Sequence, residues 1–428
     1  MMNRFIDLLK KNKEVSAWNL QQVKTKSCEL FYVLDKLEMN RATDTVGYSC
    51  TIYVDKDEKR GSASFKLFDY MTDAEIEEKI AENVFSAGFA MNAFYENPSP
   101  EDAELSESAS NLKDRPFTEI IEEVVDACFK ANSYKEGYLA ATEFFLYETE
   151  KRIVTSKGID LKSKSYKGQI EIIPSWEKDG EEVEVYDMIT YESLNPDEIT
   201  TKVDEELLLA KARFEAKPLE NKEGLRVIIQ DDEVGQILWS YARELGYASK
   251  YMKTNKFEVG QNIQGDNVTG DLLNLTLVPY YKNASGSQAF DGDGVVLKEQ
   301  EIVKDGVATA LHGTYRFGYY LGEKKPTGNI PVLVAKEGTK SFKELGEKPY
   351  LRCVKFSGMQ VDQSSGYFGG EVRLGFYFDG EKEVPVTGIA VSGNLKQSAT
   401  NLLFSKETYT GNTYHGPKFL AVDDMTIA

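Results

Sequence analysis

The feature that most constrains the fold is a strand–turn–strand–helix order that occurs twice in the first half of the chain. In the first occurrence, a strand, a charged turn, a second strand and an amphipathic helix are expected at residues 48–54, 55–61, 62–68 and 71–92. In the second, the same elements are expected at residues 169–174, 176–180, 182–189 and 194–216. Two equivalent helix positions, Ile76 and Ile199, lie 123 residues apart.

Both helices begin with a polar residue ahead of an acidic first turn, Thr72 in one and Asn195 in the other. Pro196 falls at the first helical position, where its missing N–H costs nothing. A further apolar strand is expected before each hairpin, at residues 29–37 and 143–155. We therefore expect two copies of a small antiparallel sheet closed by a helix, packed as one domain. Chance recurrence of this common order stays open as an alternative.

The rest of the chain divides into a connection, one helix and a glycine-rich half. Residues 97–116 are polar and rich in Pro, Ser and acidic residues, and residues 117–130 have the periodicity of a helix. From residue 225 onward the chain holds 25 of its 33 glycines, with one helix expected at 232–245. Strands are expected there at residues 272–277, 294–298, 299–303, 330–335, 351–358, 371–378, 384–391 and 418–423.

These patterns predict an α+β fold in two domains. Residues 1–218 form an amino-terminal domain of duplicated antiparallel strands plus helices. Residues 222–428 form a mostly antiparallel β domain, a large sheet or irregular barrel, with one main helix.

Charge and composition narrow the class of function. With 51 Lys and Arg against 70 Asp and Glu, the net charge is −19, which disfavours binding to nucleic acid or anionic lipid. No apolar run is long enough to span a membrane, and the first 15 residues lack the apolar core of a signal peptide. We expect a cytoplasmic protein whose four separated cysteines are reduced core thiols. With only two histidines, a zinc site built from several imidazoles is almost excluded.

An ordered set of short segments resembles the TldD/PmbA family, whose PmbA branch is also called TldE and "modulator of DNA gyrase". The segments are residues 156–160 (SKGID), 285–295 (SGSQAFDGDGV), 304–307 (KDGV), 314–318 (TYRFG), 326–329 (PTGN), 361–368 (VDQSSGYF), 391–394 (VSGN) and 425–428 (MTIA). The resemblance covers nearly the whole chain. It implies an α+β domain followed by a mostly β domain, and metallopeptidase activity on peptides or unfolded chains in the catalytic members.

The resemblance also implies a site that this sequence does not reproduce. The catalytic subunit of the family carries His-Glu-x-x-x-His on a helix and a later cysteine. Matching on Val234 and Gly235 places Asp231 at the first His, Asp232 at the Glu and Gln236 at the second His. A zinc hydrolase needs three protein ligands and a carboxylate near the metal-bound water. We therefore expect no zinc site and no cofactor. We interpret Asp231 and Asp232 as the acidic start of a helix, and a weak site for a hard cation is the alternative.

Other chemistries receive less support. No cysteine follows Cys353, and the nearest notable side chain in that region, His415, is expected to serve a structural or peptide-contact role rather than a catalytic one. The segment 291–294 (DGDG) lacks the later ligands of a calcium loop, and no G-x-S-x-G elbow or phosphate-binding glycine loop is present.

The leading interpretation is a PmbA/TldE-like non-catalytic partner of a TldD-like zinc peptidase, acting in peptide maturation or degradation of unfolded peptides. Its expected partners are that catalytic subunit, or a second copy in a homodimer, and a peptide or unfolded polypeptide. One alternative is an active metallopeptidase with a divergent site around Asp231, Asp232, Gln236 and His415. The other is a regulatory binding protein acting on DNA gyrase or toxin systems.

Overall fold

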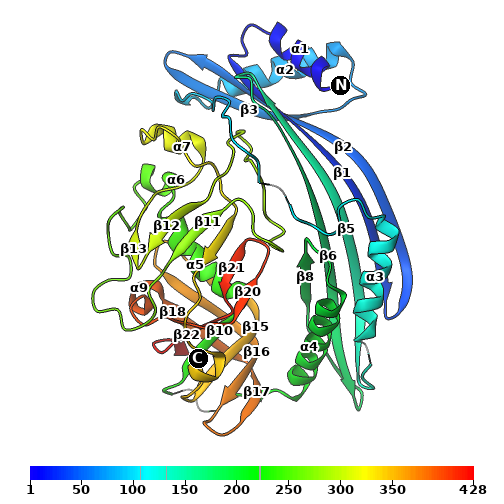
Figure 1. Cartoon of the computed structure of the whole chain (residues 1–428), viewed down its shortest axis with the longest axis vertical. Helices are drawn as coiled ribbons and strands as arrows, with labels where there is room; N and C mark the ends of the chain where they lie inside the picture. The colour runs from blue at the N-terminus through cyan, green and yellow to red at the C-terminus, as the bar shows by residue number, and fades with distance from the viewer. Residues whose placement is uncertain (107, 132, 221–222) are drawn as a thin grey trace.

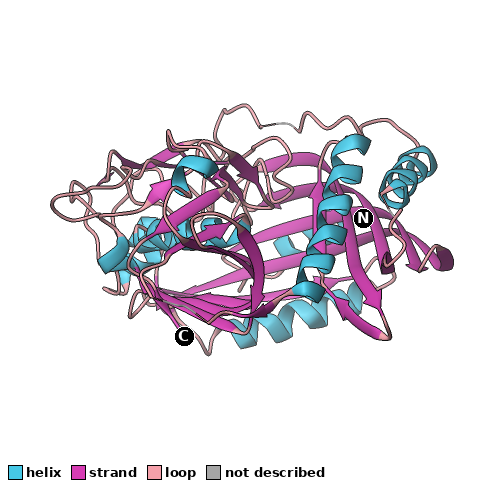
Figure 2. Ribbon diagram, turned by 90° about the horizontal axis from the view of Figure 1, so that it is seen from below, coloured by secondary structure: helices cyan, strands magenta, loops and turns pink. Residues whose placement is uncertain are grey.

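Figure 1 shows the computed structural model of the chain, which describes residues 1–106, 108–131, 133–220 and 223–428. A long curved sheet with its helices comes from the first half of the chain, and a β-rich assembly beside it comes from the second. The fold is α+β with mostly antiparallel pairing, as predicted. Figure 2 shows strands running through both halves, with helices lying along them.

The first sheet is antiparallel and has the order β4-β3-β2-β1-β5-β6-β7, with β8 also paired to β6. Its strands are β1 (Ala17–Val33), β2 (Lys36–Lys56), β3 (Lys59–Leu67), β4 (Asn92–Ala93), β5 (Gly137–Thr155), β6 (Asp160–Lys178), β7 (Glu181–Glu184) and β8 (Asp187–Tyr191). Strand β5 has 19 residues and is therefore about 60 Å long. Four strands of this length make the sheet much longer than the short segments predicted from sequence.

Four helices accompany this sheet: α1 (Met2–Lys11), α2 (Asp73–Ala87), α3 (Phe117–Lys130) and α4 (Pro196–Glu215). The first two bury their apolar faces at one end of the sheet, around Leu20 and Ile52. The other two pack together near the opposite end, around Phe144 and Ile170. The order helix, strands, helix thus occurs twice on either side of the β1–β5 pairing, and a duplication as its origin stays a prediction.

The two predicted helix caps differ. Thr72 forms a capping box, in which its hydroxyl accepts the N–H of Glu75 and the Glu75 carboxylate accepts the N–H of Thr72. Asn195 occupies the N-cap position of α4, as expected, but its side chain makes no capping hydrogen bond. The helix begins instead with Pro196, whose fixed φ suits the first turn.

This difference gives a matched pair of variants. Thr72→Ala is expected to lower the free energy of unfolding by about 1 kcal/mol, because it removes a side-chain acceptor for an otherwise unpaired helix N–H. Asn195→Ala should change it by less, because no such bond exists there. Urea unfolding followed by circular dichroism measures both, and equal losses would contradict the assignment of the caps.

The second half contains two open sheets. The nine-stranded sheet comprises β9 (Lys217–Pro218), β10 (Arg226–Gln230), β15 (Tyr350–Val361), β16 (Tyr367–Phe378), β17 (Glu383–Thr387), β18 (Ile389–Asn394), β19 (Leu403–Phe404), β22 (Phe419–Val422) and β23 (Thr426–Ile427). The six-stranded sheet comprises β11 (Leu275–Val278), β12 (Gln300–Lys304), β13 (Val307–Ala308), β14 (Val332–Ala335), β20 (Thr408–Thr410) and β21 (Tyr414–Pro417). Both have edge strands, so in the described residues the alternative of an irregular barrel is not realised.

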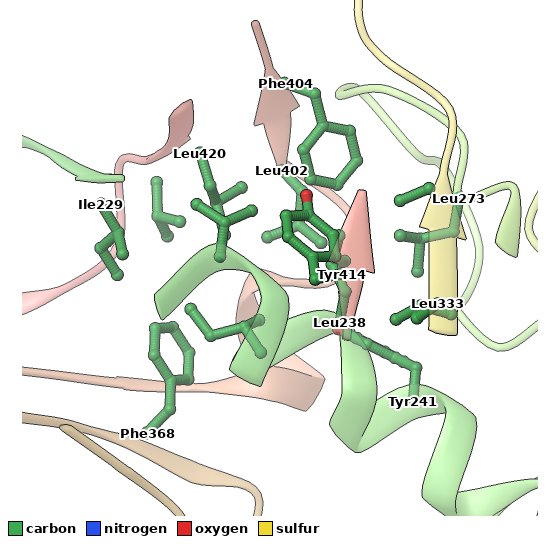
Figure 3. Packing of buried hydrophobic residues seen from close by; sticks show 14 of the residues in the cluster. Ile229, Leu238, Tyr241, Leu273, Leu333, Phe368, Leu402, Phe404, Tyr414 and Leu420 are labelled. Carbon is green, nitrogen blue, oxygen red and sulfur yellow. The ribbon is translucent and has the colours of Figure 1, made fainter. Parts of the chain in front are cut away.

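Helix α5 (Asp232–Glu244) lies between these two sheets. It contacts β10 and β15 on one side and β14 and β21 on the other. Figure 3 shows Leu238 and Tyr241 of α5 among buried side chains that include Ile229 and Tyr414. A Cβ at Gly235 would lie 2.7 Å from the Tyr414 ring, so this helix approaches β21 more closely than a larger residue permits. The short helices are α6 (Tyr247–Tyr251), α7 (Tyr315–Tyr320), α8 (Phe342–Leu345) and α9 (Leu395–Ser398).

Several predicted elements differ from the structure. The strand expected at residues 29–37 contains the turn between β1 and β2, where Leu34 has a φ of 56°. The helix expected to reach residue 92 ends at Ala87, and the strand expected at 294–298 has no counterpart beyond one isolated bridge. The segment 384–391 is divided between β17 and β18 at Gly388, which has a φ of 68°. All four cysteines are free, as expected for reduced thiols.

Candidate functional site: the cleft at the start of helix α5

The sequence-predicted site residues begin at a sharp turn from β10 into α5. All five residues of β10 are buried, and the next residue, Asp231, has φ 57° and ψ −129°. This backbone conformation is unfavourable for a residue with a Cβ, and such strain concentrates at functional sites. The turn is held in place because the Asp231 N–H donates to the Lys418 carbonyl at 2.9 Å and Gln230 Nε2 donates to Asp231 Oδ2 at 2.8 Å.

Three consecutive carboxylates follow from this turn. Asp232 Oδ2 accepts a hydrogen bond from the Tyr409 hydroxyl at 3.1 Å, and burial by the cleft walls raises the pKa of Asp232. Burial raises the pKa of Glu233 to about 7, with further contributions from Asp232 and Asp231. The start of α5 is therefore acidic in sequence, but the Asp232 and Glu233 carboxylates are partly desolvated.

The other two candidates do not join this group. Gln236 is exposed on the next turn of α5. His415 lies on β21, where its ring stacks on Tyr281 with centroids 4.0 Å apart and its Nδ1 lies 2.8 Å from Thr410 Oγ1. Burial lowers the pKa of His415, which favours the neutral ring. These contacts hold the ring in place, and the structural or peptide-contact role expected from the sequence stays a prediction.

The family's zinc ion does not fit this arrangement. Within the described residues, no group of three or more His, Cys, Asp or Glu side chains is placed to hold a metal ion. Asp231 is turned toward Gln230, Asp232 toward Tyr409, and His415 toward Tyr281. The residues at the motif positions therefore offer neither the imidazole pair nor the convergent geometry that zinc requires.

The DGDG segment also has a structural explanation. Asp291 Oδ1 accepts the N–H groups of Asp293 and Val295, and Asp291 Oδ2 accepts the N–H of Asn329, all at 3.0 Å. Gln21 of β1 donates to the Gly292 carbonyl. A carboxylate surrounded by N–H donors is a poor calcium ligand. The Gln21 contact instead connects this loop, and with it the second half of the chain, to the first sheet.

An ion network beside Asp231 was not anticipated from the sequence. Lys355 Nζ lies 2.8 Å from Glu206 Oε2 and 3.4 Å from Asp187 Oδ1, and Lys202 Nζ lies 3.4 Å from Glu206 Oε1. Asp231 lines the same cavity of about 270 Å³ as Lys202, Glu206 and Lys355. The network links α4 and β8 of the first half to β15 of the second half. Only the Lys202–Glu206 spacing of four residues was a sequence signal.

A larger cavity of about 660 Å³ lies on the other side of Asp232. It is bounded by β8 and the start of α4 on one wall and by β20 on the other. In Figure 1, α4 and β8, a strand of the first sheet, lie on the side that faces the second half of the chain. Strand β8 pairs only with β6, and β20 only with β21, among the strands of the described residues. Each of these two strands therefore has one unpaired edge, and both strands line the cleft next to the acidic start of α5.

Comparison with known proteins agrees with this architecture. Residues 222–428 match the family described as PmbA/TldA metallopeptidase C-terminal domain. The second half of this chain, residues 222–428, belongs to the TldD/PmbA family. A 134-residue stretch is 31% identical to a protein described as a metalloprotease from Methanothermobacter thermautotrophicus, and this stretch spans 27% of the chain and 29% of that relative.

Solved structures with the same fold cover the whole chain. A proposed modulator of a DNA gyrase from Thermotoga maritima matches with a TM-score of 0.79 at 19% identity, covering 100% of this chain and 99% of that one. TldE from Thermococcus kodakarensis matches with a TM-score of 0.79 at 16% identity and the same coverage. A proposed modulator of DNA gyrase from Bacteroides thetaiotaomicron matches with a TM-score of 0.80 at 17% identity, covering 100% and 97%. At these identities the likeness establishes the fold of this TldD/PmbA member.

No helix in the part of the chain that the structure describes is both long enough and apolar enough to cross a membrane.

Proposed function

We propose that this TldD/PmbA member is a non-catalytic subunit that assembles with a zinc-bearing relative of the TldD type in the cytoplasm. The observation that carries the proposal is that Asp231, Asp232 and Gln236 do not converge at the start of α5. The resemblance matches these three residues to the family's zinc-motif positions. A zinc hydrolase needs three ligands and an open position for water. A partner would supply these, and the complex would act in peptide maturation or in degradation of unfolded peptides.

The contribution of this chain would be to hold the peptide. An extended peptide binds by adding a strand to a free sheet edge, and the cleft has such edges in β8 and β20. Main-chain pairing is largely independent of side chains, which suits an unfolded substrate. The Tyr409 hydroxyl and Asp232 at the base of the cleft add polar contacts for a bound peptide.

The first experiment distinguishes a non-catalytic subunit from an active metallopeptidase. The purified chain is expected to hold much less than one zinc per molecule by elemental analysis and to leave unfolded casein intact. Addition of a relative that carries His-Glu-x-x-x-His should yield a complex in size-exclusion chromatography and faster cleavage than the relative alone. Stoichiometric zinc with chelator-sensitive cleavage by this chain alone would instead support the divergent metallopeptidase.

Variants in the cleft test the peptide-holding role within that complex. Thr201 on α4 lines the cavity between β8 and β20, and Thr118 on α3 is an equally exposed helical threonine elsewhere. Thr201→Trp should fill the cleft and slow casein cleavage by the complex, while Thr118→Trp should not. Equal activity of both complexes would contradict peptide binding in the cleft. Binding to gyrase subunits without any effect on peptide cleavage would favour the regulatory alternative.

A further inference from the structure

A second cavity, remote from α5, has a lining opposite in charge to the rest of the protein. It measures about 470 Å³ and lies over β1, β5 and β6, beside the segment that leads into α3. Its cationic residues are Lys24, Lys113, Lys151, Arg152, Lys162 and Lys164, and Glu150 is the one carboxylate among the described lining residues. Six cations around one cavity are unexpected in a chain of net charge −19.

The strand register explains how these cations come together. Glu150 of β5 lies opposite Lys24 of β1 and Lys164 of β6, and one row further along Arg152 lies opposite Lys162. Because side chains alternate across a strand, these two rows share one face of the sheet. Like charges placed directly opposite each other destabilise a sheet, so the Arg152–Lys162 pair has an energetic cost.

Carboxylates neutralise only part of this cluster. Lys24 pairs with Glu150 at 3.6 Å, Arg152 with Asp160 at 2.7 Å and Lys164 with Glu148 at 3.1 Å. No carboxylate of the described residues forms an ion pair with Lys113 or Lys162. Lys151 lies between the two rows in sequence, so its side chain belongs to the opposite face of the sheet. The Lys113 and Lys162 ammonium groups are therefore available to an anion that enters the cavity.

An independent feature of the same cavity also points to a ligand. Tyr166 of β6 lines it and is only 5% exposed, and its hydroxyl donates to no acceptor in the described structure, since the Lys164 ammonium beside it is itself a donor. The Lys164 ammonium lies 5.4 Å from the centre of the Tyr166 ring, which places a cation beside this hydroxyl. A buried hydroxyl without an acceptor is costly, and an acceptor oxygen bound in the cavity would satisfy it.

We propose that this basic pocket binds a compact polyvalent phosphate, such as an oligophosphate. Lysine ammonium groups act as point charges for phosphate oxygens, and hydroxyl donors such as Tyr166 complete the contact. The cavity encloses a small anion rather than a long polymer, and the net charge of −19 disfavours an extended nucleic acid across the surrounding surface. The proposal is independent of the peptide cleft and of a partner subunit.

Calorimetric titration of the full chain with tripolyphosphate at low ionic strength tests the proposal. Saturable binding is expected, weakening as sodium chloride is added. Lys162→Ser and Lys113→Ser should each weaken binding by about tenfold or more, because each removes a charge-assisted hydrogen bond. The control Lys382→Ser, at the exposed turn between β16 and β17, should bind as the parent does. Tyr166→Phe should also weaken binding while keeping the ring in the core.

Thermal unfolding provides a second readout that does not depend on a heat of binding. Tripolyphosphate should raise the melting temperature of the parent chain, and Lys162→Ser should raise it without ligand by removing the repulsion from Arg152. Absence of saturable tripolyphosphate binding, or binding unaffected by Lys162→Ser and Lys113→Ser, would overturn the proposal. Tighter binding of tetraglutamate than of tripolyphosphate would overturn it in favour of an acidic polypeptide ligand.

Discussion

Lys355→Met is expected to lower the free energy of unfolding by about 3 kcal/mol, since it removes one partner from a buried ion network. The Glu206 side chain is 1% exposed, and burial, followed by repulsion from Asp187, raises its pKa to about 7. Lys355 contributes the shortest ion-pair contact to Glu206, at 2.8 Å. Without it, Glu206 must either stay ionised beside Lys202 alone or take up a proton.

A matched control separates burial from charge. Lys250 also forms an ion pair, with Glu258, but the Glu258 side chain is 61% exposed. Lys250→Met should therefore change the free energy of unfolding by less than about 1 kcal/mol. Both losses can be measured by urea unfolding at pH 8, and a loss below about 1 kcal/mol for Lys355→Met would contradict a structural role for the network.

The double variant Glu206→Leu with Lys355→Met tests whether the stability lost by Lys355→Met comes from leaving the Glu206 carboxylate without its partner. Replacing both charges by apolar groups removes the unpaired carboxylate, so the double variant should regain part of the stability lost by Lys355→Met. The network joins α4 and β8 to β15, so the single variant should also open the cleft. Faster proteolysis around α4 in Lys355→Met than in Lys250→Met would report this opening.

Sequence periodicity correctly predicted those helices that carry a regular apolar face along their whole length. Helix α3 was placed at its observed bounds, and α5 within one residue, because both carry a continuous apolar face. The long strands were underestimated because charged residues such as Lys24 and Glu150 lie along them, where the apolar alternation stops. The turn at Leu34 carried no Gly, Asn or Pro signal.

For the site, the sequence placed Asp231 and Asp232 correctly at the start of α5 but did not reveal what surrounds them. Lys355 and Asp187 are 168 residues apart and meet only through the packing of β15 against α4 and β8. Likewise, the sequence put His415 near the family's late motif position, but the stacking on Tyr281 depends on the pairing of β21 with β14 and β20. Such contacts between distant segments cannot be predicted from sequence patterns until the pairing and packing of the strands are known.

Glu233→Gln is expected to make the protein more stable at pH 8 and to leave its stability nearly unchanged at pH 4.5. The folded-state pKa of Glu233 is raised to about 7 from an ordinary value of 4.5, chiefly by burial. The favourable helix N-terminus, which contributes about 0.3–1 kcal/mol for a carboxylate, does not compensate for this desolvation. Between pH 4.5 and about 7, Glu233 keeps a proton in the folded chain that it has released in the unfolded chain.

Stability therefore falls as pH rises from 4.5 to about 7 and stays lower above that range. The shift corresponds to at most about 3 kcal/mol, and partial exposure of Glu233 reduces the expected gain of Glu233→Gln to about 1–3 kcal/mol at pH 8. Glu77→Gln on α2 is the control, because the Glu77 side chain is 54% exposed. Melting temperatures measured from pH 4.5 to 8 should diverge between Glu233→Gln and the parent only as pH rises. Parallel curves would show that Glu233 ionises in the folded chain as it does in water, and that the start of α5 is more open to solvent than its packing implies.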